Sequence, residues 1–220
     1  MSLDSNLSRR FDLLRTLLIA GLVALHVPPA VDIPFAGPTV VGPALVAKIF
    51  LGNVLFRGTV PVLGVISGFL LFRRRERDHW ALVRRKVRTL LVPFLLWNIP
   101  VVLALWAVSA LRLSDYQFRA DLATFVGVLD ALFGLRGLPV NLPLGYLRDI
   151  FVCALFAPAL GWFLAEVPWL GLALLAAEAY VWPLQPLFLR PELPLFMYVG
   201  GLMATGRLSV RMFDRGWVWW

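Results

Sequence analysis

The sequence predicts an all-α membrane protein, a bundle of about six transmembrane helices with one further helix at the membrane surface. The 220 residues are 60% hydrophobic and only 15% charged, whereas about 25% of the residues in a soluble domain are charged. The mean hydropathy is +0.80. The apolar residues also gather in long runs, so most of the chain is expected to lie in a lipid bilayer.

Six apolar runs are expected to form the transmembrane helices. All but the last, which is short, can cross a hydrocarbon core of about 30 Å. The first differs from a cleaved signal peptide, because no small-residue cleavage site follows it and further spans do. No internal repeat or low-complexity linker divides the chain, so residues 1–220 are predicted to form a single domain. The runs are 11–28, 49–72, 89–111, 144–165, 169–189 and 193–207.

Positive charges predict the orientation of these helices. The densest basic segment, 73–88, reads RRRERDHWALVRRKVR and is expected in the cytoplasm, because cytoplasmic loops carry an excess of Arg and Lys. Counting back two spans places the N-terminus inside as well. The segment 28–47 is rich in Pro and Gly and carries one charged residue, Asp32, as an outer loop can. The expected location is therefore the bacterial cytoplasmic (inner) membrane.

The segment 121–141 has two interpretations. It reads DLATFVGVLDALFGLRGLPVN and, as a seventh span, would place the basic C-terminal tail outside. Asp130 and Arg136 make it a poor span, and a tail on the inside agrees better with the positive-inside rule. We therefore predict that this segment forms an amphipathic helix on the outer face of the membrane.

Ionisable residues inside the first apolar run indicate a functional site, because charges within spans are costly and rare. Arg15 and His26 are eleven residues apart, which on a helix places them on one face and about 16 Å apart along its axis. With the N-terminus inside, Arg15 lies at the cytoplasmic rim and His26 lies deep in the outer half. Asp12 precedes Arg15 by one turn and could orient its guanidinium group.

Other charged residues are expected near the same two depths. Arg57 is sixteen residues before the basic loop and should reach about the depth of His26. Arg148 and Asp149 enter the membrane from the outer side, so these four residues could form one buried polar cluster, although Arg148 and Asp149 could also simply pair with each other.

The inner side carries a second group of charges. Arg85 and Arg88 are one turn apart at the foot of the third span and could form a phosphate clamp with Arg15. This layout suits a long phosphorylated carrier such as coenzyme A, with its phosphates at the cationic mouth and its thioester near the imidazole. Histidine suits the deep position because its ordinary pKa of about 6.5 lets it exchange a proton near neutrality.

The net charge of +8 does not indicate nucleic-acid binding, because the basic residues gather at the ends of apolar runs. The expected partners are the lipid bilayer and an acyl-CoA. The sequence holds no metal-ligand cluster, Gly-rich phosphate loop or serine-hydrolase elbow, so no metal is expected. The single cysteine, Cys153, excludes an internal disulfide.

Several motifs together resemble the acyltransferase 3 family of membrane-bound O-acyltransferases. DLLR at 12–15 with His26 resembles the Asp-x-x-Arg and Arg-x10-His pattern of the family's first helix. RGTVPVLGVISGFLLFRR resembles its second helix, RKVR at 85–88 resembles its Arg-x-x-Arg, and LPLGYLRDIFVCALFAPAL resembles its Trp-Phe-Leu-Arg-Asp-Leu helix. The order and spacing of these motifs extend through most of the chain.

The resemblance implies transfer of an acetyl or similar acyl group from cytoplasmic acyl-CoA to a sugar hydroxyl, typically of a surface glycan. It assigns proton transfer to His26 and coenzyme contacts to Arg15, Arg85 and Arg88. We further expect Arg57 to stabilise the developing oxyanion, and we assign Arg148 and Asp149 to substrate binding.

The chain departs from the family pattern at three points. Leu63-Gly64 stands where paired aromatic residues are usual, and Gly145-Tyr146 replaces Trp-Phe. The chain ends at Trp220, whereas the family typically has about ten helices, so a C-terminally incomplete domain is expected. Two other functions therefore remain open: a transporter or flippase for an anionic or glycan substrate, and an inactive truncated membrane protein. Ser67-Gly68 is interpreted as a packing position between helices.

Overall fold

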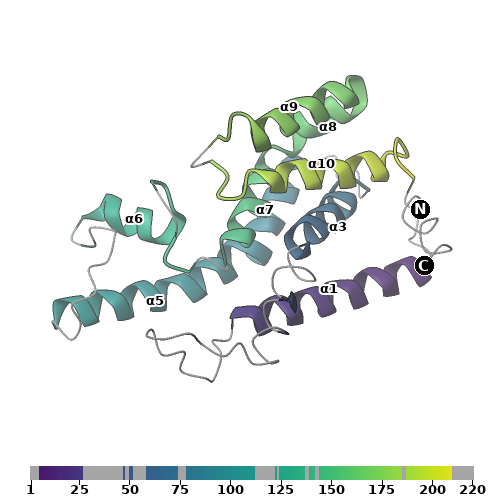
Figure 1. The fold of residues 1–220 in the computed structure, drawn as a ribbon. Coiled ribbons are helices and arrows are strands. Elements are labelled where there is room, and N and C mark those ends of the chain that lie inside the picture. The colour runs from purple at the N-terminus through teal and green to yellow at the C-terminus, as the bar shows by residue number, and fades with distance from the viewer. Residues whose placement is uncertain are drawn as a thin grey trace, which may run out of the picture.

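The computed structural model describes residues 5–26, 47, 50–51, 58–73, 78–111, 122, 124–136, 139–141, 144–184 and 187–209. Within these residues the chain forms helices and turns and no strand, as an all-α protein should (Figure 1). The helices are α1 (Ser5–His26), α3 (Thr59–Arg73), α4 (His79–Lys86), the π-helical segment η2 (Val87–Leu91), α5 (Val92–Ala110), α6 (Phe125–Phe133), α7 (Gly145–Leu155), α8 (Ala157–Glu166), α9 (Pro168–Tyr180) and α10 (Glu192–Ala204).

The pairing of α3 with α10 is the centre of the fold (Figure 1). Gly64 of α3 lies against Leu193 of α10, and Gly68 lies against the backbone of Met197. The two helices are therefore parallel, and the absence of a side chain at Gly68 lets their backbones approach closely. Buried side chains continue this core toward α7 and α4, among them Leu193, Ile150 and Leu82.

Helix α1 packs against α3 in the opposite direction. The rings of Phe11 and Phe69 meet edge to face with their centroids 5.4 Å apart. Because Phe11 belongs to the first half of α1 and Phe69 to the second half of α3, the two helices are antiparallel. This arrangement agrees with the predicted reversal between the first two apolar runs.

The number of membrane spans is not confirmed. Within the described residues one continuous helical stretch, His79–Ala110, is long and apolar enough to cross a membrane. The predicted span 144–165 is divided into α7 and α8, which meet at an angle of 60°. Pro158 lies in the first turn of α8, where its missing N–H interrupts the helical hydrogen bonds. Together α7 and α8 would make a second span if they are counted as one.

The ambiguous segment 121–141 contains the helix α6. Thr124 caps its start by accepting a hydrogen bond from the amide of Gly127 at 3.1 Å, and Gly134 ends it with a φ of 63°, a conformation that favours glycine. Ala131 and Leu132 pack against Val102 of α5. The structure thus confirms a helix here, while its place on the outer membrane face remains a prediction.

Candidate coenzyme-binding cavity

A small cavity with three cationic residues lies between α1, α3 and α4. Its volume is about 190 Å³, and it is lined by Arg15, Ser67, Leu70, Leu71, Arg85 and Lys86. The antiparallel packing of α1 on α3 brings Arg15 next to residues that are more than fifty positions away in the sequence. The predicted association of Arg15 with Arg85 is therefore present in the geometry, and Lys86 is an addition that the sequence analysis did not make.

Arg88 and Asp12 lie differently from Arg15 and Arg85. Arg88 belongs to the π-helical segment Val87–Leu91, and its side chain is exposed. It is not among the described residues that line the cavity. The side chain of Asp12 is also exposed, and the described residues show no ion pair between it and Arg15. Their roles in binding the coenzyme and in orienting Arg15 remain predictions.

The hydroxyl of Ser67, which lines the cavity, lies next to the hydroxyl of Tyr146. The Oγ of Ser67 and the phenolic oxygen of Tyr146 are 3.4 Å apart, at hydrogen-bond distance. In the predicted packing motif Ser67-Gly68, glycine contacts α10, whereas serine lines the cavity.

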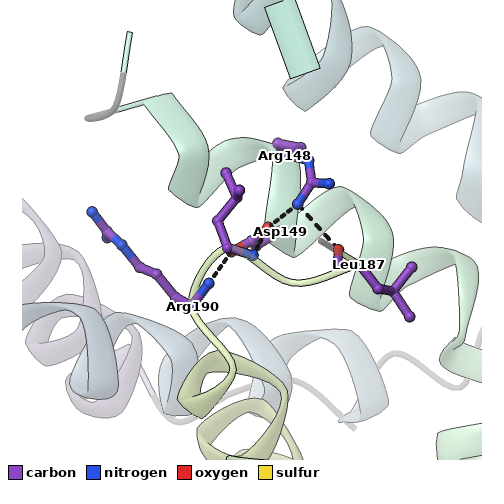
Figure 2. Close-up of polar contacts among 5 residues, drawn as sticks. Arg148, Asp149, Leu187 and Arg190 are labelled. Carbon is purple, nitrogen blue, oxygen red and sulfur yellow. Dashed lines mark hydrogen bonds and ion pairs between the residues drawn. The ribbon is translucent and has the colours of Figure 1, made fainter. Parts of the chain in front are cut away.

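Arg148 and Asp149 form a buried ion pair (Figure 2). The Nη1 of Arg148 donates to the Oδ1 of Asp149 at 2.8 Å and to the carbonyl oxygen of Leu187 at 3.1 Å. Asp149, which is fully buried, also accepts from the backbone amides of Leu189 at 3.2 Å and Arg190 at 3.0 Å. The pair thus ties the start of α7 to the turn before α10. Substrate binding by these two residues remains a prediction.

His26 is the last residue of α1 and follows Arg15 by eleven residues on this continuous helix, Ser5–His26. The side chain of His26 and the whole of Arg57 lie outside the described residues. The predicted polar cluster of His26, Arg57, Arg148 and Asp149 is therefore described only for its last two members.

Sequence reasoning missed Tyr146 and Arg190 as neighbours of the site. Tyr146 was noted as a departure from an aromatic pair, and its hydroxyl is the feature that distinguishes it from phenylalanine. Arg190 lies in the turn 189–191, just before α10, and no sequence spacing relates it to Arg15. Within the described part of the chain no three His, Cys, Asp or Glu residues gather as a metal site would require.

Comparison with known proteins gives a consistent result. The succinoglycan biosynthesis protein ExoH of Rhizobium meliloti (strain 1021) is 36% identical over 220 residues, which cover 97% of this chain. The chain spans 58% of the length of ExoH. No solved structure matches. The family model described as an acyltransferase domain matches residues 8–220, and this nearly complete match, together with the motifs above, shows that the chain belongs to the acyltransferase 3 family.

Proposed function

We propose that this chain is the membrane-embedded part of an O-acyltransferase that moves an acetyl or similar acyl group from cytoplasmic acyl-CoA to a glycan hydroxyl. Membership of the acyltransferase 3 family supports the class of reaction, and the role of ExoH in succinoglycan biosynthesis supports a glycan acceptor. The observation that carries the proposal is the cavity in which Arg15, Arg85 and Lys86 meet. It would lie on the cytoplasmic side of the inner membrane, with the N-terminus inside.

The cavity suits the phosphates of coenzyme A. Guanidinium groups bind phosphate oxygens through paired, charge-assisted hydrogen bonds, which are about twice as strong as neutral ones. Leu70 and Leu71 form the apolar part of the wall and limit the access of water, which strengthens these interactions. Arg15 and Arg85 come from different helices, so a phosphate held between them would also fix the position of α1 against α4.

His26 would then act at the reacting end of the donor. It lies eleven residues beyond Arg15 on the same helix face, about 16 Å further along the axis. In the proposed reaction the imidazole takes the proton of the acceptor hydroxyl, whose oxygen attacks the thioester carbonyl. Arg57 stabilises the resulting oxyanion. The carbon–sulfur bond then breaks, and the coenzyme thiolate takes up the proton from the imidazolium.

A second route to the same products uses histidine as the nucleophile. The imidazole would attack the thioester, release the thiolate and carry the acyl group to an acceptor on the other side of the bilayer. The two routes differ in whether the protein itself becomes labelled. Only the second route leaves labelled acyl groups on the protein when no acceptor is present. Trapping label on the unaltered chain and losing it in His26→Ala would select this second route.

Transfer of labelled acetyl from acetyl-CoA into membrane material tests the proposal. The unaltered chain should transfer label, and His26→Ala and Arg15→Gln should not, while all three melt at the same temperature. Arg84→Gln is a matched control, because Arg84 is exposed on the same helix as Arg85. Transfer by His26→Ala at the unaltered rate would refute the assigned role of His26. Substrate accumulation in sealed vesicles without an acyl donor would favour transport instead.

Equilibrium binding of labelled acetyl-CoA separates the two arginines of the predicted clamp. Arg85→Gln should raise the Kd for the coenzyme by about ten- to a hundredfold, since a charged hydrogen bond contributes about 1.5–3 kcal/mol. Arg88→Gln tests whether this exposed side chain also reaches the ligand. Equal losses in the two variants would place both on the coenzyme, whereas a loss limited to Arg85→Gln would restrict the clamp to the cavity.

A further inference from the structure

Arg190 carries a donor group that is buried inside the protein. Its Nη1 is inaccessible to solvent and has no hydrogen-bond partner among the described residues. A buried unsatisfied donor costs about 1–3 kcal/mol, and more when it is charged. Figure 2 shows the guanidinium group of Arg190 pointing away from the Arg148–Asp149 pair, so this ion pair does not satisfy it. The charged group is therefore available for an anionic ligand.

The position of Arg190 is fixed through its backbone. Its amide donates to the Oδ2 of Asp149 at 3.0 Å, and Asp149 is in turn paired with Arg148 at 2.8 Å. A fully buried carboxylate that accepts from two successive backbone amides holds the turn before α10 in one place. Because folding already orders the backbone of Arg190, a ligand that binds its side chain has a smaller entropic cost to overcome, which favours tight binding.

The backbone of Arg190 lies close to Tyr146 and, through it, to the cavity. The amide of Arg190 bonds to Asp149, which follows Tyr146 by one turn of α7, and Leu189 lies against Gly145. The hydroxyl of Tyr146 is in turn 3.4 Å from Ser67 in the cavity wall. Arg15, Arg85 and Lys86 line the same cavity, and an anion bound there would reduce the repulsion among these positive charges. The two hydroxyl groups can donate to the same anion.

Helix packing sets the order of these residues along α3. Because α3 and α10 are parallel, with Gly64 against Leu193, Arg190 lies toward the Thr59 end of α3. Leu70 and Leu71, which share the cavity wall with Arg85, lie toward the other end. A ligand that follows α3 from the Arg85 side therefore meets Ser67 and Tyr146 next and Arg190 last.

We propose that Arg190, with the hydroxyls of Ser67 and Tyr146, binds the phosphate that joins the pantetheine arm of the acyl-CoA. Arg85 and Lys86 would take the phosphates at the nucleotide end. This assignment rests on the proposed function, because it presupposes an acyl-CoA donor in the cavity. It adds Arg190 and Tyr146 to the residues that touch the donor.

Displacement of labelled acetyl-CoA from the full chain by 4′-phosphopantetheine and by pantetheine tests the assignment, because these two probes differ by one phosphate. The unaltered chain should prefer the phosphorylated probe. Arg190→Gln should weaken binding of that probe by about ten- to a hundredfold and leave pantetheine unchanged. Tyr146→Phe should weaken it by about two- to tenfold, and Arg136→Gln, which alters an exposed arginine, should have no effect.

The possible results separate this inference from the proposed function. An undiminished preference for the phosphorylated probe in Arg190→Gln would overturn the inference alone, since the donor would still bind. A fall in kcat with an unchanged Kd would also overturn it, because Arg190 would then act on the reacting carbonyl. Arg190→Lys should bind with intermediate affinity, because it keeps the charge and loses the paired donors. If the unaltered chain binds no acetyl-CoA, both proposals fail together.

Discussion

Replacement of Gly68 by alanine should separate the two central helices. A Cβ atom at this position would lie 2.6 Å from the carbonyl carbon of Met197 and 2.7 Å from its Cα, whereas ordinary contact begins at 3.4 Å. The atoms in the way are backbone atoms of α10, so no side-chain rotation can make room for the methyl group. Gly200 meets the backbone of α3 in the same manner, with Phe69 N at 2.6 Å from a built Cβ.

The magnitude follows from the clash and from helix propensity. Forcing a methyl group into a well-packed core costs about 1–3 kcal/mol, while alanine in a helix interior returns about 0.5–1 kcal/mol relative to glycine. Because the blocking atoms belong to the backbone, the clash should cost an amount in the upper part of this range, which leaves a net loss of about 1–2.5 kcal/mol. At about 2–4 °C per kcal/mol for a chain of this size, the melting temperature should fall by about 2–10 °C.

Thermal unfolding of the purified chain in detergent measures the effect. Gly161→Ala is the matched control, because a Cβ there would be 3.9 Å from the ring of Phe72, an ordinary contact. That variant should melt at or slightly above the temperature of the unaltered chain. If Gly68→Ala melts together with Gly161→Ala, the close approach of α3 and α10 is wrong.

Two other substitutions test buried polar contacts elsewhere in the fold. Asp149→Asn removes the countercharge of the Arg148 guanidinium, which is only 7% exposed. The change should destabilise the chain by about 3–5 kcal/mol, which size-exclusion chromatography would show as a loss of the folded fraction. Tyr198→Phe removes the hydrogen bond from the buried hydroxyl to the carbonyl oxygen of Pro168 at 3.0 Å. This loss should lower the free energy of unfolding by about 1 kcal/mol, measured by the same thermal unfolding. An unchanged melting temperature would mean that this link between α9 and α10 contributes nothing.

The helices were largely predictable from the sequence, whereas their ends and bends were not. Apolar runs mark residues that avoid water, but a helix can extend into polar residues, and α1 begins at Ser5 rather than at residue 11. The bend between α7 and α8 arises at Phe156, two residues before Pro158. Proline near the start of a helix is common, so its presence alone does not distinguish a bent span from a straight one.

The predicted clamp illustrates a local feature that helical spacing does not capture. Arg85 and Arg88 are one turn apart on a regular α-helix, yet Arg85 lines the cavity and Arg88 is exposed. Arg85 lies in α4, whereas Arg88 lies in the π-helical segment Val87–Leu91, which leads directly into α5. Pro93, in the first turn of α5, lacks the amide that would bond to the carbonyl of Thr89, and its ring crowds that carbonyl. A widened turn just before the proline relieves both problems and shifts the register of the face.

Charges inside apolar segments indicate function, but the sequence alone does not separate a ligand-binding charge from one that positions another residue. The hydrogen bonds provide this distinction. Asp149 accepts from Arg148 and from two backbone amides, so its acceptor capacity is largely used within the protein. Arg190 keeps a buried donor without a partner among the described residues. Asp149→Asn should consequently weaken coenzyme binding only together with stability, whereas Arg190→Gln should weaken binding while the chain remains folded.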